Sequence, residues 1–93
     1  MIIIIAKSVV KDERLEEYKV LAKKLVEESQ KEAGCISYNL YQDINNKNVL
    51  TFIEEWKDKE AIALHNSSVH FATIVPKFAE LRESSEVNLY EII

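Results

Sequence analysis

The chain alternates between stretches in which apolar residues run together or alternate and stretches in which they recur every three or four positions. Residues Ile2–Val10 are β-branched and apolar almost throughout, which predicts a strand. Ile2 and Ile4 lie on one face of this strand and Ile3 and Ile5 on the other. Because both faces begin apolar, we expect both to be covered.

A long amphipathic helix is predicted to follow this strand. Asp12 is a suitable N-cap for the helix. Gly34 stands where a left-handed residue is expected beyond the C-terminus of the helix. Glu, Lys and Gln fill most positions between the members of an apolar stripe, which is typical of a helix packed on one side. The stripe consists of Leu15, Tyr18, Ala22, Leu25, Val26, Ser29 and Ala33.

The next two segments predict a β-hairpin. Residues Cys35–Asp43 alternate, and Tyr38 shares its face with Ile36 and Leu40. A polar turn of Asn and Lys residues follows, and Val49–Trp56 forms the second strand. The side chains on one face of this second strand are Leu50, Phe52, Glu54 and Trp56.

Two short helices and a last strand complete the predicted elements. Asp58 can cap the first of these helices, and Ser67 or Ser68 can cap the second. Pro76 lies within the apolar stripe of the second helix and should kink it or end it early. The last strand is predicted over Glu86–Ile93.

The predicted element order is β-α-β-β-α-β, the ferredoxin-like α+β arrangement, in one domain over residues 1–93. Both helical regions then lie on one face of a four-stranded antiparallel sheet. The other face is bare, and we expect it to carry Ile or Val from the first and last strands. A bare apolar sheet face marks an association surface, and a closed twofold dimer is the commonest way to cover one. We therefore expect a homodimer.

Composition and charge narrow the classes of partner. Twelve basic and sixteen acidic residues give a net charge of −4, which does not favour binding to nucleic acid or to a membrane. The longest apolar run, Met1–Ala6, is too short to span a bilayer, and no signal-peptide pattern is present. The single cysteine, Cys35, excludes an internal disulfide and agrees with a reducing compartment. We expect a cytoplasmic protein.

Familiar catalytic motifs are absent from the sequence. It contains no Gly-rich phosphate loop, HExxH, CxxC or GxSxG, so Rossmann or P-loop nucleotide cofactors are not expected. The two histidines, His65 and His70, are five residues apart, roughly 140° around a continuous helix, which is poor for chelating one metal. A break near Asn66–Ser68 would change that angle, but two histidines without a third ligand are a weak signal. We therefore predict no metal site.

A cleft between the sheet and the second helical region is the more informative prediction. If the Leu50 face looks toward the helices, Phe52 and Trp56 wall an apolar pocket near His65. Phe52 fits the core better than a pocket wall, and Trp56 fits either. Glu54 in such a pocket needs a partner or has its pKa raised by desolvation. His65 is either a partly exposed helix-end residue near the last carbonyls or a general base that faces a ligand, and its spacing alone favours the first.

Three further residues are weaker candidates. Tyr38 and Tyr41 lie on opposite strand faces, so at most one of them points into the cleft. His70, near the start of the last helix, is interpreted as structural. Cys35, at a strand start, is interpreted as a small buried hydrophobe.

Three patterns along the chain occur together in one known protein family. They are Gly34 through Tyr38 and Asp43, then Glu54-x-Trp56, then His65-x-x-Ser68-x-His70-Phe71. In combination they resemble the antibiotic biosynthesis monooxygenase (ABM) domain family, and its quinol monooxygenase-like members most closely. The resemblance covers essentially the whole chain. It implies a dimeric α+β barrel, in which two ferredoxin-like sheets pack face to face.

The resemblance also implies a chemistry. Oxidative members of the family oxidise phenolic or quinol substrates with molecular oxygen, without flavin, haem or metal, so no cofactor is expected. A deprotonated hydroxylated aromatic is electron-rich enough to reduce oxygen, and the protein then needs a base and a dry cavity. The resemblance makes His65 the leading catalytic base or donor. The residues assigned to substrate binding are Trp56, Phe71, Tyr38, Phe52, Glu54 and His70.

Relatives with the same fold perform chemistries other than the oxidation of phenols or quinols. Haem-degrading relatives use an asparagine in the first strand and a histidine late in the second helical region. Here the first strand has no asparagine and the matching later position falls near Val75, which disfavours haem degradation. A relative that processes a furanone-type signalling molecule performs isomerase chemistry. An isomerase or lyase acting on a small carbonyl compound, and a non-catalytic dimer that binds small molecules, therefore remain as alternatives.

Overall fold

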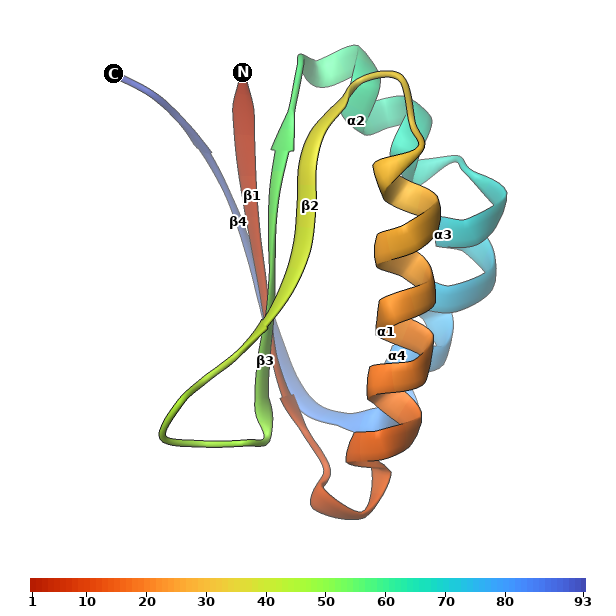
Figure 1. The fold of residues 1–93 in the computed structure, drawn as a ribbon, viewed down its shortest axis with the longest axis vertical. Coiled ribbons are helices and arrows are strands. Elements are labelled where there is room, and N and C mark those ends of the chain that lie inside the picture. Colours follow the sequence, from red (N-terminus) through yellow and green to blue (C-terminus); the bar gives the residue numbers. More distant parts are fainter.

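The computed structural model describes all of residues 1–93 and has two layers, a sheet and a set of helices that all cover one of its faces (Figure 1). The strands are β1 (Ile2–Val10), β2 (Cys35–Gln42), β3 (Val49–Trp56) and β4 (Arg82–Glu91). They form one antiparallel sheet in the order β2-β3-β1-β4. The helices are α1 (Leu15–Gln30), α2 (Lys59–Asn66), α3 (Val69–Ile74) and α4 (Phe78–Leu81). This confirms the ferredoxin-like prediction.

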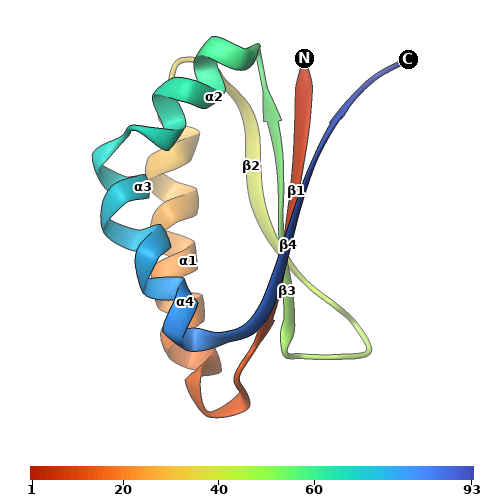
Figure 2. The same ribbon diagram turned by 180° about the vertical axis from the view of Figure 1, so that it is seen from behind.

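The view from behind shows that the four helices leave the opposite sheet face uncovered (Figure 2). None of the helices combines the length and apolar character needed to cross a membrane. The strand register fixes which side chains face the helices. Ile4 pairs with Glu54 and Leu89, and Ala6 pairs with Phe52 and Val87. These positions, with Leu50 and Trp56, lie on the helix side of the sheet, so the face of β3 that the alternation defined looks toward the helices.

The core lies between the sheet and the helical layer. Tyr18, Ala22 and Leu25 from the predicted helical stripe are fully buried there, together with Leu50 and Trp56 of β3. Burial of large apolar side chains against the sheet, rather than helix propensity, stabilises an amphipathic helix of this kind. The predicted stripe is therefore confirmed as the packing face from Leu15 to Ser29, whereas its last member, Ala33, is exposed beyond the end of α1.

The predicted capping residues differ in outcome. The side chain of Asp58 accepts a hydrogen bond from the Ala61 amide, and that of Ser68 accepts one from the Phe71 amide, so both caps are confirmed. The prediction for Asp12 is wrong. Its carboxylate accepts a hydrogen bond from Asn48 Nδ2 at 3.2 Å, within a short 3₁₀ turn that precedes α1. Pro76 ends the third helix early, as predicted, because a 3₁₀ turn (Val75–Lys77) replaces its continuation.

Gly34 serves close packing and not a left-handed turn. The prediction of a left-handed residue is wrong, since no glycine in the chain has a positive φ. A Cβ placed on Gly34 would lie 2.3 Å from Cβ of Ala61 on α2. The Gly34 carbonyl also accepts a hydrogen bond from the Lys57 amide at 2.9 Å. The glycine therefore lets the turn after α1 press against the start of α2.

Gly34→Ala is expected to destabilise the fold by about 1–3 kcal/mol, because the added methyl overpacks a buried contact. Urea unfolding would measure the change in free energy of unfolding. Combining it with Ala61→Gly should recover part of the loss, since the glycine removes the opposing methyl group. Strictly additive effects of the two substitutions would contradict the steric explanation.

Strand β4 begins earlier than predicted. It starts at Arg82 rather than at Glu86, because its pairing with β1 continues through Val9↔Ser84 and a register shift to Val10↔Arg82. Val87 and Leu89 face the helix side and not the bare face, contrary to the expectation for the last strand.

A register shift also changes the faces of β2. It lies between Cys35 and Ser37 and turns Ile36 away from the face of Tyr38. Ile36 is consequently exposed, whereas Tyr38 is buried. The prediction that these two side chains share a face is therefore wrong, because a bulge interrupts the alternation.

The bare face of the sheet takes its apolar groups from β1 and β3. Ile5 pairs with Ile53 and Val9 with Val49 across the two central strands, on the side away from the helices. The expected contribution from the first strand is therefore present. The homodimer that this face suggests stays a prediction.

Candidate active site

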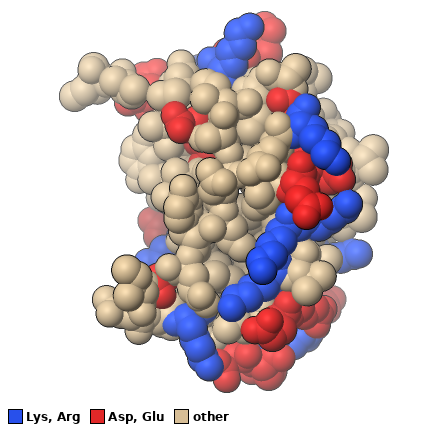
Figure 3. Space-filling model, viewed as in Figure 1, with Lys and Arg blue, Asp and Glu red and all other residues tan.

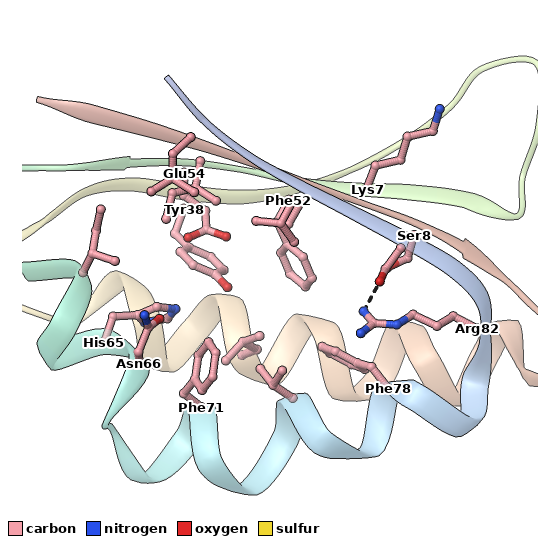
Figure 4. A pocket seen from close by; sticks show the side chains of 18 of the residues that line it. Lys7, Ser8, Tyr38, Phe52, Glu54, His65, Asn66, Phe71, Phe78 and Arg82 are labelled. Carbon is pink, nitrogen blue, oxygen red and sulfur yellow. Dashed lines mark hydrogen bonds between the residues drawn. The ribbon is translucent and has the colours of Figure 1, made fainter. Parts of the chain in front are cut away.

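A cavity of about 330 Å³ lies between the sheet and the helical layer. This volume is at the lower end of the range of small-molecule sites. Its middle is aromatic, with Phe52, Phe71 and Phe78 among the lining side chains (Figure 4). Polar side chains line its two ends. Tyr38, Glu54, His65 and Asn66 lie toward one end, and Ser8 and Arg82 lie toward the other (Figure 4).

His65 lies in the last turn of α2 and is only 2% exposed. Its ring stacks on Trp56, with centroids 4.5 Å apart, and meets the ring of Phe71 edge-on at 5.1 Å. It is therefore not the partly exposed helix-end residue that its spacing favoured. Burial lowers the pKa of His65, although the nearby Glu32 carboxylate opposes that effect. The ring is accordingly neutral near pH 7, as a base must be.

Glu32, in the turn after α1, holds both histidines. Its Oε2 atom lies 2.6 Å from Nδ1 of His65 and 2.8 Å from Nε2 of His70. A carboxylate oxygen only accepts hydrogen bonds, so both ring nitrogens donate to it. The neutral ring of His65 then carries its proton on Nδ1, and Nε2 remains free to accept a proton. This is the way a carboxylate fixes the tautomer of a catalytic histidine.

The break between α2 and α3 brings His70 to the same carboxylate. Ser67 ends α2, and Ser68 donates a hydrogen bond through Oγ to the His65 carbonyl at 2.7 Å. The chain changes direction here, so the angle of a continuous helix does not apply. The two histidines therefore converge despite their spacing of five.

Glu32, His65 and His70 are also the residues that could hold a metal ion. Their donor atoms all lie within 4.8 Å of one another. Two histidines and one carboxylate are the donor set of many non-haem iron sites. The distances of 2.6 and 2.8 Å are those of hydrogen bonds. A cation would have to replace both shared protons, so metal binding and hydrogen bonding are competing states of this cluster.

Glu54 is a buried acid in the cavity wall. Its side chain accepts a hydrogen bond from Trp56 Nε1 at 2.9 Å, and the residue is 5% exposed. Burial raises the pKa of Glu54 to about 7, while hydrogen bonds from Trp56 and Tyr38 partly offset the rise. Both features agree with the expectation that a carboxyl group here needs a partner or a shifted pKa. Glu54 can therefore exchange a proton near neutral pH.

Five of the seven predicted site residues line the cavity. They are His65, Tyr38, Phe52, Glu54 and Phe71. Trp56 and His70 do not line it. Trp56 is completely buried behind His65 and Glu54, which it contacts, and His70 touches the site only through Glu32.

The structure also places Tyr41 and Cys35, two residues that were considered as weaker candidates. Tyr41 lies on the bare face, so only Tyr38 points into the cleft. Cys35 is half-buried, and burial raises the pKa of its thiol to about 11. The thiol therefore stays protonated, as expected of a small hydrophobe.

Two residues important for the cavity were not predicted. Glu32 lies in the turn after α1, more than thirty positions from either histidine, and it comes close to them only in the folded chain. Arg82 was not singled out, because the last strand was predicted to begin only at Glu86. The available signal was the antiparallel order, which places the start of β4 beside the end of β1.

The chain is similar to known proteins over nearly its whole length. The family model described as antibiotic biosynthesis monooxygenase matches residues 1–77. The Bacillus subtilis protein named "Putative monooxygenase YcnE" is 37% identical over 81 residues, which cover 87% of this chain and 85% of that protein. A crystal structure of a conserved protein from Methanosarcina mazei Go1 has a TM-score of 0.95 and 41% sequence identity. The match covers 99% of this chain and 92% of the Methanosarcina chain. A crystal structure of an antibiotic biosynthesis monooxygenase has a TM-score of 0.95 and 30% sequence identity. The match covers 100% of this chain and 99% of the other.

Proposed function

The chain belongs to the antibiotic biosynthesis monooxygenase family, and from this premise we propose that it oxidises a small phenolic or quinol-type aromatic with molecular oxygen. The observation that carries the proposal is the Glu32–His65 pair at the wall of an aromatic cavity. In this proposal the protein uses no bound cofactor, because the substrate itself supplies the electrons.

The reaction begins with proton removal. Nε2 of His65 takes the proton of a phenolic hydroxyl, and the resulting anion transfers an electron to oxygen. Recombination at a ring carbon forms a C–O bond, and loss of water completes the reaction. For a naphthoquinol, the products are a hydroxynaphthoquinone and water. All four electrons come from the substrate, so no external reductant is consumed.

The other cavity residues support this chemistry in distinct ways. The rings of Phe52, Phe71 and Phe78 exclude water and match a flat substrate. Tyr38 and Glu54 are near the His65 end and can donate hydrogen bonds to negative charge that develops on oxygen (Figure 4). Glu54 can do so at and below its pKa of about 7, while it carries a proton.

The proposal is tested by oxygen uptake in a sealed cell. Purified protein is mixed with 1,4-naphthoquinol or anthrone, with a metal chelator and without flavin or nicotinamide. We expect uptake above the spontaneous rate, and one labelled oxygen atom in the product when ¹⁸O₂ is supplied. A rate that appears only when Fe²⁺ replaces the chelator would assign the Glu32 cluster to metal binding. No enhancement with any such substrate would contradict the proposal.

Isomerisation of a small carbonyl compound is the second candidate. It is favoured by one observation, because one cavity is lined by Glu54, whose pKa burial raises to about 7, and by His65, whose pKa burial lowers, so that one can donate a proton and the other accept one. It predicts deuterium uptake from D₂O at carbon without oxygen. A purely structural dimer is less well supported, because the aromatic side chains leave about 330 Å³ open rather than filling it. A dimer that binds a small molecule without catalysis would bind the ligand and show neither oxygen uptake nor deuterium exchange.

We also propose that the bare sheet face binds a second copy of the chain. Ile5 and Ile53 lie opposite each other near the middle of this face. Ile5→Lys is expected to shift the mass measured by light scattering from about 22 kDa to the 10.8 kDa of one chain. Ile44→Lys is the matched control, since Ile44 is 99% exposed in the hairpin loop. A mass of one chain for the unmodified protein would contradict the dimer.

A further inference from the structure

The end of the cavity away from His65 contains a guanidinium group without an anionic partner. Arg82, the first residue of β4, is half-buried and lines the cavity. It donates one hydrogen bond, from Nη1 to Ser8 Oγ at 3.2 Å (Figure 4). None of the seven ion pairs of the structure includes it. A guanidinium offers five N–H donors, so most of its binding capacity is unused.

A second polar group at the same end also lacks a partner. The hydroxyl of Tyr18 is completely buried and makes no hydrogen bond, and Tyr18 lines the same cavity. Its ring packs on Phe78, with centroids 4.5 Å apart, which holds it in place. Burial raises the pKa of Tyr18, and its polar neighbours Ser8 and Arg82 partly offset the rise. A buried hydroxyl without a partner is costly, and a ligand oxygen would satisfy it.

The charge distribution around the molecule makes this guanidinium distinctive. Blue and red side chains intermingle over the visible outer face of the helical layer, where many of them form ion pairs (Figure 3). Arg82 instead lies against Ser8 and Phe78 inside a largely apolar cavity (Figure 4). Electrostatic interactions are stronger in such a place than at the surface. An anionic ligand group would therefore be bound more tightly here than at a surface arginine.

We propose that Arg82, Ser8 and Tyr18 form an oxyanion-binding subsite for a flat aromatic ligand that carries a carboxylate or phenolate opposite its reacting end. The proposal deepens the proposed function and rests on it only for which end of the ligand reacts. The anionic group binds at Arg82, the rings lie between Phe52, Phe71 and Phe78, and the other end reaches His65. This orientation also keeps the negative charge away from Glu54 at the far end (Figure 4).

The subsite is tested by binding, without turnover. The two probes are 6-hydroxy-2-naphthoate and 6-hydroxy-2-naphthamide, which share shape and differ in charge. Calorimetry near neutral pH on the unmodified protein should show at least about tenfold tighter binding of the acid, the gain typical of charge-assisted hydrogen bonds. In Arg82→Gln the ratio of the dissociation constants of amide and acid should fall to about one, mainly through loss of affinity for the acid. Ser8→Ala keeps the guanidinium and should keep most of the preference.

Equal affinity of the unmodified protein for acid and amide would overturn the proposal, even if a variant failed to fold. So would a preference that survives in a folded Arg82→Gln protein. The result is independent of the proposed function. If no quinol is oxidised but the acid preference depends on Arg82, the subsite stands and the oxidase function fails. If quinols are oxidised and no acid preference exists, the subsite alone fails.

Discussion

His65→Ala is expected to lower enzyme-dependent oxygen uptake by about 10²–10⁴-fold, the usual contribution of a general base. His65 is the only histidine at the wall of the cavity, and Glu32 holds its proton on the nitrogen away from the substrate. The initial rate with 1,4-naphthoquinol, after subtraction of the spontaneous rate, measures the effect. Circular dichroism and urea unfolding establish that the variant is folded.

Variants of Glu32 and His70 separate the role of the base, His65, from the roles of the residues around it. Glu32→Gln keeps the size of the side chain but can also donate a hydrogen bond to Nδ1, which favours the wrong tautomer of His65. A large loss of rate is therefore expected, with a smaller effect on substrate binding. His70→Ala is the matched control, because His70 contacts the same Glu32 oxygen but does not line the cavity. His70→Ala should lower the rate of oxygen uptake much less than His65→Ala or Glu32→Gln.

The pH dependence gives an independent reading of the same group. Because burial lowers the pKa of His65 from its ordinary value of 6.5, protonation of His65 should lower the rate only below that pH, whereas ionisation of Glu54 should lower the rate above about pH 7. An unchanged rate in a folded His65→Ala protein would remove His65 from the mechanism. Equal losses in His65→Ala and His70→Ala would assign both histidines to a shared structural or metal-binding role.

The fold could be predicted because each element has a strong local signal. The apolar run of β1, the helical stripe around Tyr18 and the side-chain caps at Asp58 and Ser68 all depend on residues near one another in sequence. The errors arose where tertiary contacts override such signals. Gly34 is required by Ala61 on another helix. Strand β4 includes a polar run because it pairs with β1.

The candidate site could be predicted only in part for the same reason. The β3 alternation put Phe52 and Glu54 on one face of the strand, and the structure brings that face to the cavity with His65. The partner of His65 could not be predicted, because Glu32 reaches it from a different turn. The position of Arg82 could not be predicted either. Arg82 reaches the cavity because the start of β4 pairs with the end of β1, and this pairing is a tertiary contact.

Glu54→Gln is expected to make the protein more stable than the unmodified chain at pH 9, by about 3 kcal/mol. The pKa of Glu54 is about 7 in the folded protein, against 4.5 for an ordinary glutamate. The folded state therefore holds the Glu54 proton more tightly than the unfolded state. The stability that this proton contributes is fully present below pH 4.5 and is lost as pH rises through 7. Glutamine stays neutral and can still accept the hydrogen bond from Trp56.

Urea unfolding from pH 4 to pH 9, followed by the fluorescence of the single tryptophan, measures the difference between the two proteins. The curves should nearly meet at pH 4 and separate mostly between pH 5 and pH 8. Glu55→Gln, on the opposite face of β3, is the matched control and should not reproduce the separation. A constant difference across the range would contradict the raised pKa of Glu54. The expected gain would show that an ionisable group weakens the fold at the cavity wall, as a group retained for proton transfer would.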